Sequence, residues 1–222
     1  MGGQFGAIAN REVLQMTGTT YTLTVVNNSS HFADFCVYQR SPDLGVRDAL
    51  SLAWLAVPLW PTTVEVFTWQ IDYSFVWSQT GVLKPGVRFG ASQAWPADPG
   101  DTNANQVLFD YQQGAFTFQP GAAAGTPQRG GLYVRELADI PADTASVGIG
   151  MSGSGTFAVQ AQPNENLVFT PHPTYWVAAG TFEQGVALDV EEISNTAQVP
   201  FDSTFAMTAV LDARNNWTVR AS

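Results

Sequence analysis

The sequence predicts an all-β fold: an antiparallel β-sandwich or jelly-roll-like domain that forms a single large unit behind a short N-terminal arm. The strongest observation is that large apolar residues occupy every second position of one segment: Phe67, Trp69, Ile71, Tyr73, Phe75 and Trp77. The residues between Thr68 and Ser74 at the alternate positions are polar. A period of two is typical of a half-buried strand, so we expect one long strand, or two with a bend, whose aromatic stripe faces the core.

The second observation is compositional. The chain has 222 residues, of which 45% are hydrophobic and only 13% are charged. Globular chains usually carry about 25% charged residues. A chain of this length and composition can form one large sandwich or barrel, and its low charge indicates extensive burial, including burial at subunit contacts.

The third observation is a succession of short strand patterns separated by turn residues, with no helical segment between them. We expect strands at 19–26, 35–39, 50–57, 64–77, 87–91, 107–111, 115–118, 132–136, 146–151, 156–161, 167–170, 175–178, 186–193, 205–211 and 217–220. The strands at 107–118 and 205–220 should form two hairpins, and the Gly/Ala-rich segment 120–131 should be a loop. A parallel α/β fold is excluded because the chain has no room for crossover helices.

Residues 1–18 differ from the β-domain at 19–222. Phe5, Ile8, Val13 and Met16 recur at helical spacing, which predicts a short amphipathic helix that Gly18 would end. Two interpretations stay open for this segment: a frayed tail, or an arm that docks on a neighbouring subunit through Phe5, Ile8 and Val13. Met16 also offers an alternative start, which would make residues 1–15 an extension.

The charge of the chain limits the partners that it can bind, and its cysteine content indicates how that residue is used. The net charge is −10, and Lys84 is the only lysine, so the chain lacks a basic surface for nucleic acid or anionic membranes. No apolar run reaches the ~18 residues of a membrane span. The N-terminus lacks the pattern of a secretory signal, so we expect a cytoplasmic product and leave signal-independent export open. Cys36 is the single cysteine and stands in an apolar segment, which indicates a buried thiol.

The sequence gives little support for nucleophilic catalysis or for a metal site. The segment 148–155 is rich in glycine and serine but fails the spacing of a nucleophile elbow, so we expect a tight turn or bulge there. His31 and His172 are interpreted as turn residues. Asp98, Asp101 and Asn103 fit an Asx-rich turn better than a calcium loop. We therefore expect no metal and no cofactor.

A pair of carboxylates and a pair of tryptophans are further candidates for functional residues. Asp189 and Glu191 would face the same way on a strand, as paired carboxylates do in glycosidases, although a solvated strand face is the simpler explanation. Trp60 and Trp95 stand next to prolines in expected loops, and they are candidates for stacking against a ligand.

Several segments resemble the rhizosphere-expressed protein family of nodulating rhizobia, the first product of the rhi operon. They are 21–30, 35–39, 42–46, 51–54, 71–73, 94–99, 151–157, 159–164 and 169–173. The resemblance covers about residues 19–222. It implies quorum-controlled expression and a role in plant–microbe interaction, and it implies no cofactor and no catalytic residues.

Three functional hypotheses follow. The first is a non-enzymatic structural or interaction protein that self-associates, because the chain is aromatic-rich, poor in charge and carries an apolar arm. The alternative is a binding module for a small apolar or carbohydrate ligand. A glycoside hydrolase that uses Asp189 and Glu191 ranks last.

The arm generates a direct prediction. A segment as short as 5–16 is marginal as an isolated helix, so it needs a surface to become ordered. If a neighbouring copy supplies that surface, Phe5→Asp combined with Ile8→Asp should convert an oligomer to a monomer without unfolding the β-domain. Light scattering checks the mass. An unchanged mass, or a wild-type chain that is monomeric at high concentration, would contradict the docking arm.

Overall fold

The computed structural model describes residues 18–41, 43–122 and 126–222, and these residues contain seventeen strands and no helix. The strands are β1 (Thr20–Asn27), β2 (Ala33–Arg40), β3 (Leu50–Ser51), β4 (Leu55–Leu59), β5 (Val64–Gln70), β6 (Tyr73–Ser78), β7 (Gln93–Pro96), β8 (Gln106–Gln112), β9 (Ala115–Gln119), β10 (Leu132–Glu136), β11 (Ser146–Met151), β12 (Ser154–Gln160), β13 (Asn166–Phe169), β14 (Thr174–Gly180), β15 (Thr196–Val199), β16 (Ala206–Leu211) and β17 (Trp217–Ala221). The all-β prediction is confirmed.

The strands form four sheets. Sheet 1 has the order β17-β16-β1-β5, and sheet 2 has the order β15-β14-β2-β4. Sheet 3 has the order β3-β12-β11-β6-β7, and sheet 4 has the order β13-β10-β8-β9. The expected antiparallel pairing is wrong for two neighbouring pairs, β1 with β16 and β8 with β10, which are parallel. Both parallel pairs join strands that are distant enough in sequence for other strands to lie between them.

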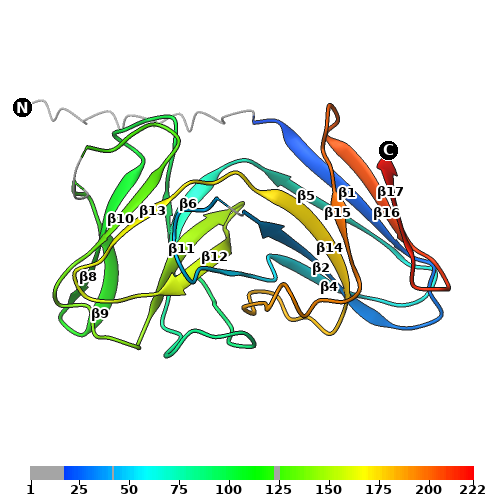
Figure 1. Cartoon of the computed structure of the whole chain (residues 1–222), viewed down its shortest axis with the longest axis horizontal. Helices are drawn as coiled ribbons and strands as arrows, with labels where there is room; N and C mark the ends of the chain where they lie inside the picture. Colours follow the sequence, from blue (N-terminus) through cyan, green and yellow to red (C-terminus); the bar gives the residue numbers. More distant parts are fainter. Residues whose placement is uncertain (1–17, 42, 123–125) are drawn as a thin grey trace, which may run out of the picture.

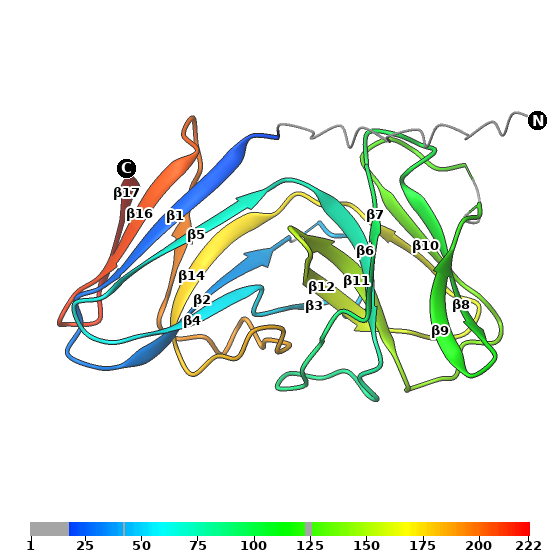
Figure 2. The same ribbon diagram turned by 180° about the vertical axis from the view of Figure 1, so that it is seen from behind.

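The sheets are arranged as two sandwiches that lie side by side along the long axis of the molecule (Figures 1 and 2). Sheets 1 and 2 enclose one core, with Leu23, Phe67 and Trp69 from one sheet packed against Phe35 and Val177 from the other. Sheets 3 and 4 enclose a second core, which includes Phe75, Ile149, Phe109, Val134 and Phe169. The chain builds half of the first sandwich, then the second, and then returns through β14–β17 to complete the first.

The aromatic stripe is divided between the two sandwiches. β5 belongs to sheet 1 and β6 to sheet 3, so the expected bend separates two strands in different sheets. Phe67 and Trp69 are buried as predicted. Ile71 falls on the bend and is 49% exposed, so its predicted place in the core is wrong. Ser74, expected on the solvent side, is also buried, because both faces of β6 are covered.

Loops account for the other differences. The segment 186–193, predicted as a strand, is a loop after β14, and 87–91 makes only an isolated bridge between Arg88 and Val186. The predicted strand 50–57 divides into β3 and β4, which lie in different sheets. Two strands were missed, β7 and β15. The predicted hairpins β8–β9 and β16–β17 are confirmed.

These loops cover two of the outer sheet faces. On sheet 2, Cys36, Tyr38 and Ala178 point away from the first core and pack under Phe182 and Leu188 of the loop after β14. On sheet 3, Val76 and Ala158 pack under Phe89 and Ala187. Figure 1 shows both loops on the same side of the molecule, below the strands that they cover. Burial raises the pKa of the Cys36 thiol, as expected of a core cysteine.

Two carboxyl residues of sheet 4 are buried among the described residues, Asp110 and Glu136, and Glu136 is the one whose pKa is raised. Glu136 ends β10 on the inward face and is 1% exposed. One oxygen accepts the backbone N–H of Gln162 at 3.1 Å, and the other has no partner among the described residues. Burial raises its pKa to about 8, with a smaller contribution from Glu165 in the same direction and an opposing one from the Gln162 N–H.

Glu136 should therefore make stability depend on pH. Between about pH 4.5 and 8 the folded chain keeps a proton that the unfolded chain has lost, so the free energy of unfolding should fall as pH rises. Glu136→Gln should remove this fall and leave the variant roughly 2–4 kcal/mol more stable than wild type near pH 9. Urea unfolding at about pH 5 and about pH 9 measures the effect, and Glu192→Gln, which changes an exposed carboxylate that does not contribute to the pKa of Glu136, serves as the control. Equal pH dependence in Glu136→Gln and wild type would contradict the assignment.

Candidate functional site

The two sandwiches meet at the bend between β5 and β6, among other contacts. Ser152, in the turn between β11 and β12, accepts a hydrogen bond from the Gln70 N–H at 3.1 Å. The Ser152 N–H donates to Asp72 Oδ1 at 2.7 Å, and its hydroxyl lies 3.1 Å from the same oxygen. Ser152 has a φ of 51°, as the first residue of a tight turn with Gly153, so the expected turn in 148–155 is confirmed.

Met151, the residue before Ser152, holds the same turn through contacts in the core of the first sandwich. Met151 ends β11 of the second sandwich, yet its side chain packs into the core of the first. Its carbonyl oxygen accepts a hydrogen bond from the indole of Trp54 at 3.0 Å. Its sulfur lies 3.8 Å from the hydroxyl of Tyr175 and 3.7 Å from the amide of Gln39. One turn of the second sandwich is thereby anchored in the first.

Two hollows flank the bend, and Ile71 and Tyr73 line both of them. The first, here called the Gly18 groove, has a volume of about 480 Å³ and is lined by Gly18, the bend residues 70–73, residues 96–99 and Ala104. Gly18 is the first described residue. The oligomer contacts predicted for Phe5, Ile8 and Val13 lie outside the described residues.

The second, here called the aromatic hollow, has a volume of about 320 Å³ and opens at the end of the first sandwich. Its aromatic lining consists of Tyr21 of β1, Tyr73 of β6, Tyr175 of β14 and Phe201 after β15. Trp69 lies behind these rings, with its centroid 5.1 Å from that of Tyr175 and 5.4 Å from that of Phe201. Sequence alternation predicted that Tyr21 and Tyr73 face inward, but their convergence with Tyr175 and Phe201 depends on strand pairing that local patterns do not reveal.

The two tryptophans proposed for stacking lie elsewhere. Trp60 is 66% exposed in the turn before β5, and its ring packs against that of Phe32 with centroids 4.8 Å apart. Trp95 is in β7 rather than in a loop, and it packs half-buried against the second core. Neither residue lines a hollow at the bend. The stacking role remains a prediction for both.

The carboxylates proposed for hydrolysis do not form a strand face. Asp189 and Glu191 are exposed in the loop after β14, and Asp189 accepts the N–H of Glu191 at 3.2 Å in a local turn. The geometric basis of the pairing, two side chains on one face of a strand, is therefore absent. Asp98 and Asp101 likewise accept N–H groups of their own turn, from Gly100 and Asn103. Within the described ranges, no cluster of three or more His, Cys, Asp or Glu residues could hold a metal ion.

The histidines lie in connections between strands, His31 at a bend and His172 in an irregular segment rather than in the predicted turn. His31 Nδ1 is 2.6 Å from the hydroxyl of its neighbour Ser30, and both residues are exposed. A catalytic base next to a nucleophile is usually oriented by a third group, such as a carboxylate. Among the described residues, no carboxylate pairs with this imidazole. His172 lies exposed between two prolines.

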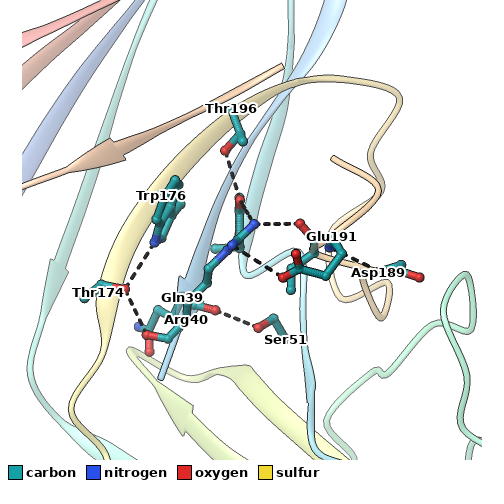
Figure 3. A network of polar contacts seen from close by, with 10 residues as sticks. Gln39, Arg40, Ser51, Thr174, Trp176, Asp189, Glu191 and Thr196 are labelled. Atoms are coloured by element: carbon teal, nitrogen blue, oxygen red, sulfur yellow. Dashed lines mark hydrogen bonds and ion pairs between the residues drawn. The ribbon is translucent and has the colours of Figure 1, made fainter. Parts of the chain in front are cut away.

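Arg40 holds the loop after β14 against sheet 2 (Figure 3). Its guanidinium donates to the Val190 carbonyl oxygen at 2.6 Å and lies 4.5 Å from the centre of the Trp176 ring. Its Nη1 is 3.7 Å from a carboxylate oxygen of Glu191, whose side chain is 85% exposed. An ion pair with so exposed a partner contributes little, so the backbone hydrogen bond and the stacking carry the attachment.

The comparisons with known proteins match the same part of the chain that forms the β-structure. The RhiA family model matches residues 18–222, which is the whole described β-region together with Gly18. Protein RhiA of Rhizobium leguminosarum bv. viciae is 38% identical over 212 residues, covering 91% of this chain and 87% of the relative. The chain belongs to the RhiA family. The resemblance drawn from the sequence is thus confirmed, and no solved structure matches.

The family assignment names no catalytic residue, and no described helix is long and apolar enough to cross a membrane. The bend, both hollows and the Arg40 attachment all lie within the region that the RhiA model matches. They are therefore candidate features of the RhiA fold rather than of an appended segment.

The Arg40 attachment gives a testable prediction. Arg40→Lys keeps the charge but loses the planar stacking on Trp176 and the fixed direction of the bond to Val190, so it should destabilise the chain by about 1–2 kcal/mol. Glu191→Gln should change stability by less than ~0.5 kcal/mol. Urea unfolding and amide hydrogen exchange over 182–195 measure both effects. Equal losses in the two variants would show that the ion pair, not the stacking, holds the loop.

Proposed function

We propose that this member of the RhiA family is a non-enzymatic interaction protein that self-associates through the outer face of sheet 1. The observation that carries the proposal is that the outward side chains of this face are exposed or half-buried and almost free of charge. The outer faces of sheets 2 and 3 are covered by the chain's own loops. Among the described residues, no loop packs in the same way over sheet 1.

The face is built from β-branched residues in register. The outward positions of β1 are Thr20, Thr22, Thr24 and Val26, and they lie opposite Gln70, Thr68, Val66 and Val64 of β5. On the other side, β16 contributes Ala206, Thr208 and Val210, and β17 contributes Thr218 and Arg220. Arg220 is the only charged residue in this set.

Charge distribution favours a second copy as the partner. Two chains with a net charge of −10 repel one another, and the repulsion is smallest where the approaching surfaces carry no acidic side chains. Val64 and Val66 are about half exposed. Burying such residues against the same face of another copy offers a hydrophobic gain that opposes the repulsion.

An exposed aromatic pair lies next to the start of β5. The turn that precedes Val64 carries Trp60, and Trp60 packs on Phe32, which is itself 47% exposed. Exposed aromatic residues of this kind are enriched in the centres of protein interfaces. We therefore include this pair in the proposed contact surface.

The family association supports a role outside metabolism. The rhizosphere-expressed family is associated with plant–microbe interaction and quorum-controlled expression, and we place this chain in the same setting. A protein made at high cell density is abundant, and self-association is favoured by high concentration. Asp189 and Glu191, the carboxylates considered for hydrolysis, lie in an exposed local turn, and His31 lies at an exposed bend, which supports the non-enzymatic part of the proposal.

A single charge on this face tests the proposal. Val66→Glu should shift the assembly toward monomer, weakening association at least 10-fold, because it places an acidic side chain opposite its own copy. Val168→Glu is the matched control, since Val168 is an exposed strand valine on sheet 4. Light scattering across a concentration series gives the mass. A monomeric wild type, or equal weakening by both variants, would contradict the proposal.

A further inference from the structure

The strand β17 forms one margin of sheet 1, next to β16 (Figure 1). Hydrogen bonds just beyond both ends of this pair show which residues of β17 bond to β16. The N–H of Asp212 donates to the Asn216 carbonyl oxygen at 3.0 Å. At the other end, the N–H of Ser222 donates to the Ala206 carbonyl oxygen at 3.1 Å. Because alternate residues of an antiparallel strand bond to a given neighbour, the even-numbered residues of β17 bond to β16. The odd-numbered residues direct their backbone groups away from β16, at the edge of the sheet: Trp217, Val219 and Ala221.

This edge is open, whereas several other sheet margins are closed. On β5, the outward N–H of Gln70 donates to the hydroxyl of Ser152. On β9, the N–H of Phe118 donates to the side chain of Gln93 at 3.0 Å, and β4 carries Pro58. Devices of this kind keep an edge strand from pairing with another chain. The sequence of β17 contains no proline, and among the described residues no hydrogen bond is recorded to its outward backbone groups.

The composition of β17 favours another copy of the same strand as its partner. The strand contains no acidic residue, and Arg220 is its single charge in a chain with a net charge of −10. Two copies therefore repel one another little where these strands approach. The side chains of Trp217 and Val219 pack on the first core, and the indole of Trp217 donates to Asn195 at 2.7 Å. The strand is thus already held in the extended form that pairing requires.

We propose that β17 pairs antiparallel with β17 of a second copy around a twofold axis at Val219, which joins two copies of sheet 1 into one continuous sheet. In this register Val219 bonds to the same residue of the second copy, and Trp217 bonds to Ala221. All of the outward residues of β17 are then paired. Thr218 lies opposite Arg220 of the second copy, whereas a register centred on Arg220 would place two guanidinium groups opposite each other.

This contact is additional to the one proposed for the outer face of sheet 1. It uses the backbone of β17, whereas the face contact uses side chains such as Val66 of β5, at the opposite margin of the sheet. A twofold axis through the paired edges leaves the outer faces of both copies on the same side of the joined sheet. Either contact can therefore form without the other.

Disulfide trapping on the full-length chain tests the register. Thr218→Cys and Arg220→Cys are prepared as separate variants, and the native Cys36 is buried. In the proposed pairing, these two positions face each other in a non-hydrogen-bonded pair, whose Cα atoms are about 4.5 Å apart, a distance that a disulfide spans. Position 218 and its own copy are diagonal neighbours, about 7–8 Å apart, which is too far for a disulfide.

Under mild oxidation, an equal mixture of the two variants should form a disulfide-linked dimer about 5-fold faster or more than either variant alone. Non-reducing electrophoresis measures the dimer. No dimer in the mixture, or equal rates in the mixture and in the single variants, would overturn the edge pairing. The second result would indicate contact through the outer face of sheet 1, where both side chains also lie.

A proline substitution tests the backbone bond itself. Val219→Pro, introduced into both cysteine variants, removes the outward N–H at the twofold axis without removing a bond to β16. It should slow the formation of the linked dimer about 10-fold or more, whereas the control Val219→Thr keeps the N–H and should leave the rate unchanged. Val66→Glu disrupts only the proposed face contact, so it should also leave the rate unchanged. An unchanged rate in Val219→Pro, or a rate that falls only in Val66→Glu, would overturn the proposal. If Val219→Pro fails to fold, the mixing experiment decides alone.

Discussion

The insertion of one tight turn into a neighbouring core is the constraint on which the rest of this structure depends. Met151 and Ser152 belong to the second sandwich, yet Met151 packs in the first core and accepts the indole N–H of Trp54. Ser152 then holds the bend through Gln70 and Asp72. The chain leaves the first sandwich at this bend and returns at β14, so the turn is one of the contacts that hold the two sandwiches together; the hydrogen bond from Ser51 of β3 to the Gln39 carbonyl oxygen of β2 is another. Both hollows are consequences of the contact at the bend, since Ile71 and Tyr73 line each of them.

The two-sandwich design also explains which surfaces remain available. The loop between β14 and β15 covers sheet 2, and together with the loop between β6 and β7 it covers sheet 3; the apolar residues of these loops form small satellite cores. Sheet 1 keeps an exposed face of threonine and valine with a single arginine. A chain with so few charges places most of its acidic residues in loops and turns, such as Asp98, Asp189 and Asp212, where they cap backbone N–H groups. The uncharged face therefore stands out against an acidic molecule.

Sequence patterns predicted the local features and missed the long-range ones, for physical reasons. Alternation found β5 correctly because one face of that strand is buried and the other is solvated, but it placed Ile71 in the core because a change of sheet leaves no local signature. It failed at β6, where both faces are covered and Ser74 is buried. The apolar run 186–193 resembled a strand because it is a covering loop that packs on a sheet. The convergence of Tyr21, Tyr73, Tyr175 and Phe201 depends on pairing between strands far apart in sequence, which no window of residues contains.

A double-mutant cycle at the bend tests the central claim most directly. Ser152→Gly removes the hydroxyl at a position whose positive φ suits glycine, and Asp72→Ala removes the acceptor. Unfolding free energies of wild type, both single variants and the double variant give the coupling between the two residues. The account predicts a coupling of about 1 kcal/mol or more, together with faster hydrogen exchange at the Gln70 amide in Ser152→Gly. Additive effects within about 0.3 kcal/mol, with exchange at Gln70 unchanged, would show that this turn does not hold the two sandwiches together.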